Sequence, residues 1–315
     1  MSFGPSLPNF TTGVGYNTKF GPVVMEPGSR VAAYVRSTGA VSDEDPVVAT
    51  NLVTTLAAGL ARCRSGKNDV VFVLPGHTEN VTATTLANLV AGTRVIGCGR
   101  GTNRPNFRWT ATTSQFVMNK ADCVFLNCIF RCEGAVVVKA FAVTAADNAI
   151  IGCDIDVGTV ASTNLSTIGI SVEAGADRFT LANNYIHGIA GATCTQVCVV
   201  SGVCDGVTVV DNKIYAATSV ATVGVVNVTA AATGLEISRN LLHNRLATSS
   251  AAGSVTGAVA CTGMANDNYC RIEDTAAVPA TTGWTLNASS LLGLFQNFTT
   301  DTKNTSGILS PAVVV

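Results

Sequence analysis

Asp154 and Asp156 stand two residues apart in CDIDVG, a spacing that lets one strand present both carboxylates on the same side. Enzymes that cleave polysaccharides use paired carboxylates, sometimes with calcium or a basic side chain. Asp154 directly follows a turn position, however, and no calcium-binding carboxylate set with a nearby basic residue can be assembled in the sequence. We interpret the pair as solvated surface and predict a chain without catalytic residues.

His187, Tyr215 and His243 recur at 28-residue intervals and form the best outward set of ring side chains. This set could hold a ligand, form a surface ladder or contact a neighbouring subunit. Sugar-binding clefts need aromatic platforms, but aromatic residues make up only 6% of the chain. Both tryptophans, Trp109 and Trp284, are expected to lie away from the regular repeats. We therefore favour the surface ladder or the subunit contact.

The chain contains eleven cysteines, an odd number that excludes a complete set of intrachain disulfides. Neither CIFRC nor CTQVC is followed by a His/Cys set with zinc spacing. Free cysteine behaves as a small hydrophobic residue, so we expect mostly reduced, buried thiols and leave some disulfides open. The sequence predicts no metal site and no cofactor.

The clearest regularity is an asparagine that returns every 28 residues, at Asn184, Asn212 and Asn240. Apolar residues keep the same places around it: Phe179, Val207 and Leu235; Leu181, Val209 and Ile237; Ile186, Ile214 and Leu242. Polar residues alternate with them, which indicates strands that break and resume at a turn. A fixed period of this length is typical of repeat architectures.

Upstream, Cys98, Cys128 and Cys153 occupy the asparagine position, and downstream Asn268 does so. The steps between repeats run 30, 25, 31, 28 and 28 residues, so insertions are confined to loops. Each repeat leaves room for two further short strands, such as those within 197–203 and 224–230. Three short strands per repeat, stacked in parallel, make a solenoid.

With these columns, the chain resembles the right-handed parallel β-helices of the pectin-lyase type over roughly residues 45–275. The resemblance implies an all-β, single-stranded parallel β-helix. In that family an asparagine at the turn between two strands stacks on its neighbours, bonds along the stack and tolerates left-handed backbone angles. It therefore gives Asn184, Asn212 and Asn240 a structural role as a turn ladder. Such a fold does not specify a function.

The stretch from Asp45 to Asp69 is predicted to be one helix that caps the N-terminal end of the solenoid. Asp45 can cap it, and Pro46 suits the first helical position. An apolar residue recurs at every fourth position, at Val48, Leu52, Leu56 and Leu60. Many β-helices of the family resembled here begin with such a capping helix.

Composition limits the function classes. Charged residues are 12% of the chain and the net charge is −1, which gives no argument for a nucleic-acid partner. No apolar run reaches the roughly 18 residues of a membrane span, and the first residues do not read as a secretory signal. A soluble chain with so little charge must cover much of its surface.

Three regions are predicted: an extended arm over 1–44, the capping helix and solenoid over 45–275, and a tail over 276–315. The arm and tail carry apolar groups that we expect to dock on partners. These candidate partner contacts are Phe3, Phe10, Tyr16, Phe20, Leu291, Leu292, Leu294, Phe295 and Phe298.

Together these features resemble bacteriophage virion proteins, most of all capsid decoration or cement proteins. The resemblance implies a non-enzymatic structural protein of the virion, assembled in the host cytoplasm. Its partners would be the major capsid protein, other virion proteins and further copies in a dimer or trimer, with no membrane or nucleic acid. The alternative is a polysaccharide-binding or -cleaving tailspike or lyase. A cell-surface adhesin is disfavoured by the missing signal peptide.

Overall fold

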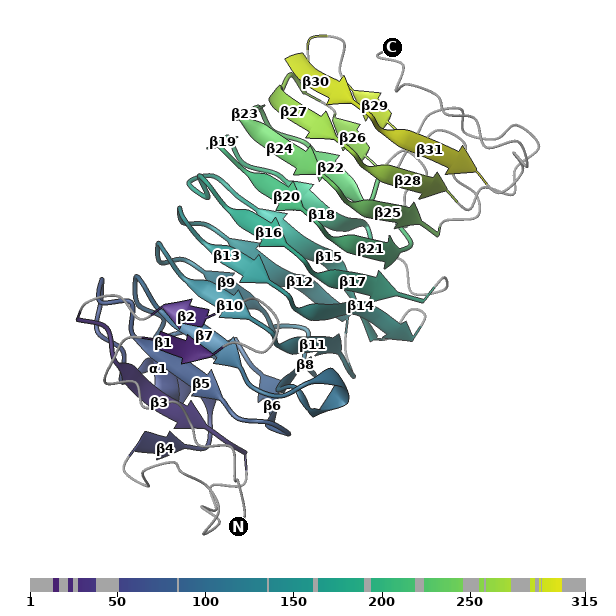
Figure 1. The fold of residues 1–315 in the computed structure, drawn as a ribbon. Coiled ribbons are helices and arrows are strands. Elements are labelled where there is room, and N and C mark those ends of the chain that lie inside the picture. Colours follow the sequence, from purple (N-terminus) through teal and green to yellow (C-terminus); the bar gives the residue numbers. More distant parts are fainter. Residues whose placement is uncertain are drawn as a thin grey trace, which may run out of the picture.

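The computed structural model of the chain is an elongated stack of short parallel strands, with β4 near one end and β30 near the other (Figure 1). The residues that the structure describes are 14–16, 22–24, 28–37, 51–83, 85–134, 136–160, 164–189, 194–218, 224–245, 255–257, 259–272, 284–286, 289 and 291–301.

Three stacks of strands form the walls of the solenoid, and we number them as faces. Face 1 contains β4 (Leu52–Val53), β3 (Val31–Val35), β5 (Val70–Val73), β7 (Arg94–Gly97), β10 (Val124–Leu126), β13 (Ala149–Ile151), β16 (Thr180–Ala182), β20 (Thr208–Val210), β24 (Leu235–Ser238), β27 (Thr262–Asn266) and β30 (Leu291–Phe295). All of its neighbouring strands pair in parallel, as a solenoid requires.

Face 2 follows the asparagine turn and contains β6 (Thr78–Val81), β8 (Asn106–Trp109), β11 (Ile129–Cys132), β14 (Asp154–Val160), β17 (Tyr185–Gly188), β21 (Lys213–Ala216), β25 (Leu241–Asn244), β28 (Tyr269–Ile272) and β31 (Phe298–Asp301). Face 3 contains β9 (Phe116–Met118), β12 (Val136–Val143), β15 (Asn164–Val172), β18 (Gln196–Val200), β22 (Val226–Val228), β26 (Val255–Gly257) and β29 (Trp284–Leu286). An antiparallel pairing between β14 and β15 joins faces 2 and 3 into one sheet.

Smaller elements lie outside the three faces. They are the antiparallel pair β1 (Val14–Tyr16) and β2 (Pro22–Val24), the parallel pair β19 (Cys204–Asp205) and β23 (Ala232–Thr233), and a 3-10 turn at Gly101–Asn103.

The predicted repeat register is confirmed. Leu181 pairs with Val209 and Val209 with Ile237, and all three side chains are fully buried. Ile186, Ile214 and Leu242 form the matching inward column of face 2. The all-β parallel solenoid is therefore correct, while its right-handed winding stays a prediction.

Aromatic rings fill the core of the N-terminal half. Phe116 and Phe130 contact each other with ring centroids 5.3 Å apart, and Phe141 lies 4.9 Å from Phe130. Trp109 belongs to the same cluster and is fully buried in β8. The expectation that both tryptophans avoid the regular repeats is wrong, because Trp284 also lies in a strand, β29.

The predicted long helix is wrong in length. The helix α1 spans only Leu56–Leu60, and the side chain of Thr55 caps it by accepting a hydrogen bond from the N–H of Ala58. Leu52 lies in β4, whose pairing with β3 competes with the helical pattern. Leu56 and Leu60 are buried in the core as expected. The predicted start at Asp45 lies outside the described residues, and the capping role stays a prediction.

The solenoid also extends beyond both predicted boundaries. Upstream of residue 45, β3 pairs with β5 in face 1. Downstream of residue 275, strands β29, β30 and β31 pair in parallel with β26, β27 and β28. The stacking register continues across residue 275, so part of the predicted tail is a further coil.

Candidate functional site

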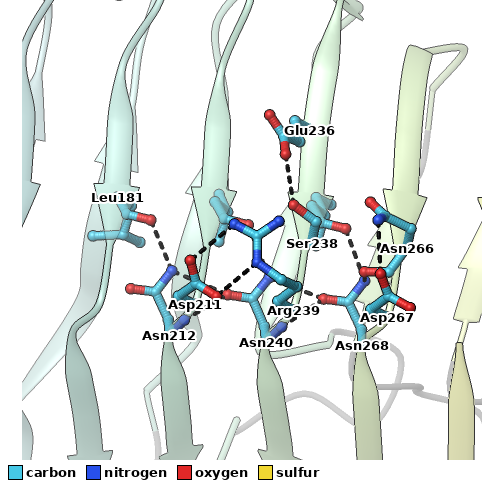
Figure 2. Close-up of polar contacts among 12 residues, drawn as sticks. Leu181, Asp211, Asn212, Glu236, Ser238, Arg239, Asn240, Asn266, Asp267 and Asn268 are labelled. Carbon is cyan, nitrogen blue, oxygen red and sulfur yellow. Dashed lines mark hydrogen bonds and ion pairs between the residues drawn. The ribbon is translucent and has the colours of Figure 1, made fainter.

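The asparagine column forms a continuous hydrogen-bonded ladder in the turn between faces 1 and 2 (Figure 2). In each step the Oδ1 of the next asparagine accepts two bonds from the previous one. The backbone N–H of Asn184 reaches Oδ1 of Asn212 at 3.0 Å, and its Nδ2 reaches the same atom at 3.0 Å. The pattern repeats from Asn212 to Asn240. The predicted turn ladder is confirmed, and its members are 2% exposed.

The ladder runs one step beyond the sequence pattern, which ended at Asn268. Asn240 bonds to Asn268, and Asn268 bonds to Asn297 at 2.9 Å. Each Nδ2 also donates to a carbonyl of the preceding coil, as Asn212 does to Leu181 at 2.7 Å. Asn297 was missed, although its 29-residue step lies within the range of 25 to 31 residues seen upstream.

The left-handed backbone belongs to the residue before each ladder asparagine, not to the asparagine. Asn183, Asp211, Arg239 and Asp267 have φ values of 54–57°. The expectation that the ladder asparagine itself takes this conformation is therefore wrong. A side chain at the left-handed position points outward, which leaves it free to form ion pairs between coils. Arg239 does so with Asp211 through two bonds of 2.8 and 2.9 Å (Figure 2).

Asp154 and Asp156 both lie on the outer side of face 2, as one strand should present them. Asp154 accepts one hydrogen bond from Arg104 at 3.1 Å, and its other carboxylate oxygen lies 2.8 Å from Nε2 of His187. Asp156 lies 3.9 Å from Arg131 and accepts a bond from the N–H of Gly158. The side chain of Asp156 is only 8% exposed. The interpretation of the pair as solvated surface is wrong, because neighbouring coils cover and pair both groups.

The pKa values of the two carboxyls are shifted in opposite directions. Burial alone would raise the pKa of Asp154, but the hydrogen bond and charge of His187 and the charges of Arg104 and Arg131 outweigh it and hold that pKa below its usual range. Burial raises the pKa of Asp156, and the nearby cations offset this only in part. Neighbouring carboxyls whose pKa values differ in this way occur in acid–base pairs and also in structural ion-pair networks.

The predicted column of His187, Tyr215 and His243 is confirmed, because these residues occupy matching positions in successive strands of face 2. His187 pairs with Tyr215, and Tyr215 pairs with His243. The rings of Tyr215 and His243 meet edge to face at 4.5 Å. His243 is only 6% exposed, however, so it offers a partner less surface than an outward ring would.

A second outward row on face 2 was missed. Tyr185, Lys213, Leu241 and Tyr269 pair in succession, each one position after a ladder asparagine. The ring of Tyr185 stacks on that of His187 with ring centroids 4.5 Å apart, and Nζ of Lys213 lies over the same Tyr185 ring, 5.2 Å from its centroid. The 28-residue period could have found this row, because it fixes the neighbour of every ladder asparagine.

The structure contradicts two of the predicted partner contacts and leaves the others as predictions. Leu292 is 7% exposed in the core and Leu294 packs against that core, so neither has the free surface predicted for it. Leu291 and Phe295 lie in β30 and Phe298 lies in β31, both strands of the last coil. Tyr16 lies in β1. Phe3, Phe10 and Phe20 lie outside the described residues.

The eleven cysteines are unpaired thiols, nine of them buried. Burial raises the pKa of Cys63 to about 11 and that of Cys153 to about 12, which keeps both thiols protonated and unreactive at neutral pH. Within the described ranges no three His, Cys, Asp or Glu side chains converge as metal ligands. No helix in that part of the chain is both long and apolar enough to cross a membrane.

Comparisons with known proteins give no relative from which a function could be proposed. No family model, curated protein or solved structure matches the chain.

Proposed function

We propose that this chain is a structural protein of a bacteriophage virion, where it decorates or cements the capsid. It would contact the major capsid protein, other virion proteins and further copies of itself in a dimer or trimer. The observation that carries the proposal is a parallel solenoid with 12% charged residues that still exposes apolar side chains. Val138 is 62% exposed, Val203 69% and Met264 55%. Partners would cover such groups.

The carboxylate geometry supports a non-enzymatic role. A hydrolase needs one carboxyl that reaches the scissile bond and one that handles water or the sugar carbon. Asp154 is instead held by Arg104 and His187, and Asp156 is nearly covered. The network joins successive coils of face 2, which is a stabilising arrangement.

The proposal assigns attachment to the N-terminal arm and to Leu291, Phe295 and Phe298 in the strands of the last coil. Phe3, Phe10, Tyr16 and Phe20 are the arm's apolar groups, and burying a side chain of that size contributes roughly 1.5–3 kcal/mol. Many copies on a symmetric shell would bind firmly even if each contact were weak. The protein would then reside in virions assembled in the host cytoplasm.

The test is incorporation into particles. Deleting residues 1–27 spares β3 and the rest of the described solenoid, and it should abolish copurification with intact capsids. The circular dichroism spectrum of the deleted chain should match that of the parent. Undiminished incorporation, or release of the full chain by about 1 M salt alone, would rule out apolar attachment through the arm.

A polysaccharide-cleaving tailspike or lyase is the second candidate, and the opposite pKa shifts of Asp154 and Asp156 beside His187 favour it. Capsular polysaccharide, lipopolysaccharide and pectic substrates should show no turnover if the structural role holds. Turnover that is lost in Asp156→Asn, with Glu133→Gln as a control, would establish the enzyme instead.

A further inference from the structure

The C-terminal half of face 2 carries a hollow of about 460 Å³ on its outer side. Its lining combines cations, rings and a leucine and contains no acidic residue. Lys213 pairs in register with Leu241, and Leu241 with Tyr269, so these side chains form one row across three rungs. We call this site the basic hollow; beside Tyr185 it is lined by Lys213, Tyr215, Leu241, His243, Tyr269 and Arg271.

We propose that the basic hollow binds residues 38–50 of a second copy of this chain, and that two copies exchange these segments across a two-fold axis. Residues 38–50 lie outside the described ranges, while the residues at their two ends, Ser37 and Asn51, lie within them. The inference deepens the contact between copies in the proposed function and rests on that part alone, because association can be measured on the isolated protein without a capsid.

Charge is the first observation behind the proposal. Lys213 and Arg271 are both exposed, and their strands, β21 and β28, lie two rungs apart in face 2. Residues 38–50 contain the run Asp-Glu-Asp at 43–45 and no basic residue. This is the only place where the chain has three acidic residues in succession. The segment and the hollow are therefore complementary in charge.

Apolar surface is the second observation. Leu241 is 38% exposed and Tyr269 is 42% exposed, and the two are paired in register between the cations. A small anion would leave these groups open to water. The acidic run is preceded by Val41 and followed by Val47 and Val48, so a peptide segment brings apolar groups to both sides of its carboxylates. Protein interfaces combine apolar anchors and charged groups in this way.

Reach decides which copy supplies the segment. It begins beside the first strand of face 2, because the N–H of Thr78 in β6 donates to Oγ of Ser37 at 3.4 Å. The middle of the hollow, at β25, lies six rungs from β6, which is roughly 29 Å at about 4.8 Å per rung. Glu44 is seven residues from Ser37 and from Asn51, so even a straight chain carries it only roughly 24 Å from either end. The segment falls short of the middle of its own hollow, and a neighbouring copy has to supply it.

The placement of the two sites along face 2 suits a two-fold axis. The segment starts at the N-terminal end of the face, and the hollow lies in its C-terminal half. Two antiparallel copies that meet face 2 to face 2 therefore place each segment over the hollow of the other. Such a contact is isologous and closes at two copies, which selects a dimer over a trimer.

The test is sedimentation velocity on the isolated full chain at low salt. We expect a dimer that dissociates as salt rises. A hollow variant carries Lys213→Glu and Arg271→Glu, and a segment variant carries Asp43→Lys, Glu44→Lys and Asp45→Lys. Each variant alone should raise the dissociation constant of the dimer about tenfold or more, which corresponds to about 1.4 kcal/mol.

Mixing the two variants gives the sharpest result. An equimolar mixture should form dimers again, because opposite charges then meet at both contacts of the mixed pair. Lys67→Glu with Lys120→Glu is the matched control: it reverses two exposed lysines in the turns before β5 and β10, changes the net charge as the hollow variant does, and should stay dimeric.

A parent chain that sediments as a monomer or a trimer would overturn the proposal. So would a dimer that survives both reversals, or a mixture that stays monomeric. Circular dichroism spectra of the variants should match the parent, and the segment variant, which changes no described residue, decides the question if the hollow variant does not fold. A monomeric chain that still joins capsids would refute this dimer and leave the proposed function standing.

Discussion

At the residue scale, the ladder asparagines explain why one amide recurs along the chain. The side chain of Asn212 accepts from the backbone and the amide of Asn184, and it donates to Leu181 and Asn240. A buried turn would otherwise leave these polar groups without partners, which is costly away from water. Only asparagine and the longer glutamine carry a side-chain amide, which accepts through its oxygen and donates through its nitrogen.

Replacing Asn212 with Ala should therefore destabilise the protein. The N–H of Asn184 would lose its acceptor, at a cost of roughly 1–3 kcal/mol for each buried group left without a partner. Urea unfolding followed by circular dichroism measures the change. Thr208→Ala on the half-exposed side of the same coil should stay within about 0.5 kcal/mol of the parent. Equal effects of the two changes would contradict the ladder's role.

The left-handed position before the asparagine allows a second test. Arg239 has a φ of 54°, where a side chain costs roughly 1–2 kcal/mol relative to glycine. Arg239→Gly and Arg239→Ala both remove the exposed pair with Asp211. The glycine variant should be the more stable by about 1 kcal/mol, measured as a difference in unfolding free energy. An alanine variant of equal or greater stability would show that this turn carries no strain.

Asp69 should make the protein sensitive to acid. Burial opposes its ionisation, but the hydrogen bonds and charge of Arg64, at 2.7 Å, outweigh burial and lower its pKa in the folded chain. A folded pKa below the unfolded value of about 3.9 gives stability that is fully present above that value and is lost as pH falls through the folded pKa. Asp69→Asn should flatten the fall in unfolding midpoint below about pH 4. An unchanged acid profile would contradict this assignment.

At the element scale, each coil is held by columns that cross it at fixed places. Val209 is fully buried between Leu181 and Ile237 and follows Thr208, which faces outward. Val209→Asp should destabilise by on the order of 4 kcal/mol or more, because it buries an unpaired charge. Thr208→Asp, one residue away, is the control and should change stability little. Thermal unfolding distinguishes the two, and a lower melting midpoint for Thr208→Asp than for Val209→Asp would place the register one residue off.

These columns were predictable from sequence because each rests on a local pattern. Alternation of apolar and polar residues fixed the inward positions, and the 28-residue period fixed the asparagines. The helix was mispredicted because a four-residue apolar spacing at Leu52 and Leu56 also suits a short strand followed by one helical turn, and pairing with β3 decided the outcome. Propensity is a weak prior where tertiary pairing is available.

The candidate sites were harder to predict for a physical reason. Arg104 reaches Asp154 across 50 residues of sequence, and His187 reaches it across 33. Contacts between coils depend on the lengths of intervening loops, which vary here by several residues. Local patterns placed Asp154 and Asp156 on one side of a strand correctly. They could not show that cations from neighbouring coils lie beside them.

At the scale of the whole molecule, nearly every contact joins a coil to the next, so stability depends on where the stack ends. The last described coil closes the core with Leu292, which is 7% exposed, and completes the ladder with Asn297. Without β29, β30 and β31, the edges of β26, β27 and β28 would lie open together with Ala265 and Cys270, which are now fully buried. Open strand edges promote aggregation.

Two truncations test where the solenoid ends. A chain that stops after Asp301 keeps every described strand and should unfold near the parent's midpoint. A chain that stops after Ile272 removes the last coil, exposes the apolar core beneath it and orphans the N–H of Asn268, which now bonds to Asn297 at 3.1 Å. That shorter chain should aggregate or melt well below the parent, as light scattering and thermal unfolding would show. If it instead remained monomeric with the parent's midpoint, residues 284–301 would be dispensable for the stack, and the sequence-based boundary at 275 would be the better one.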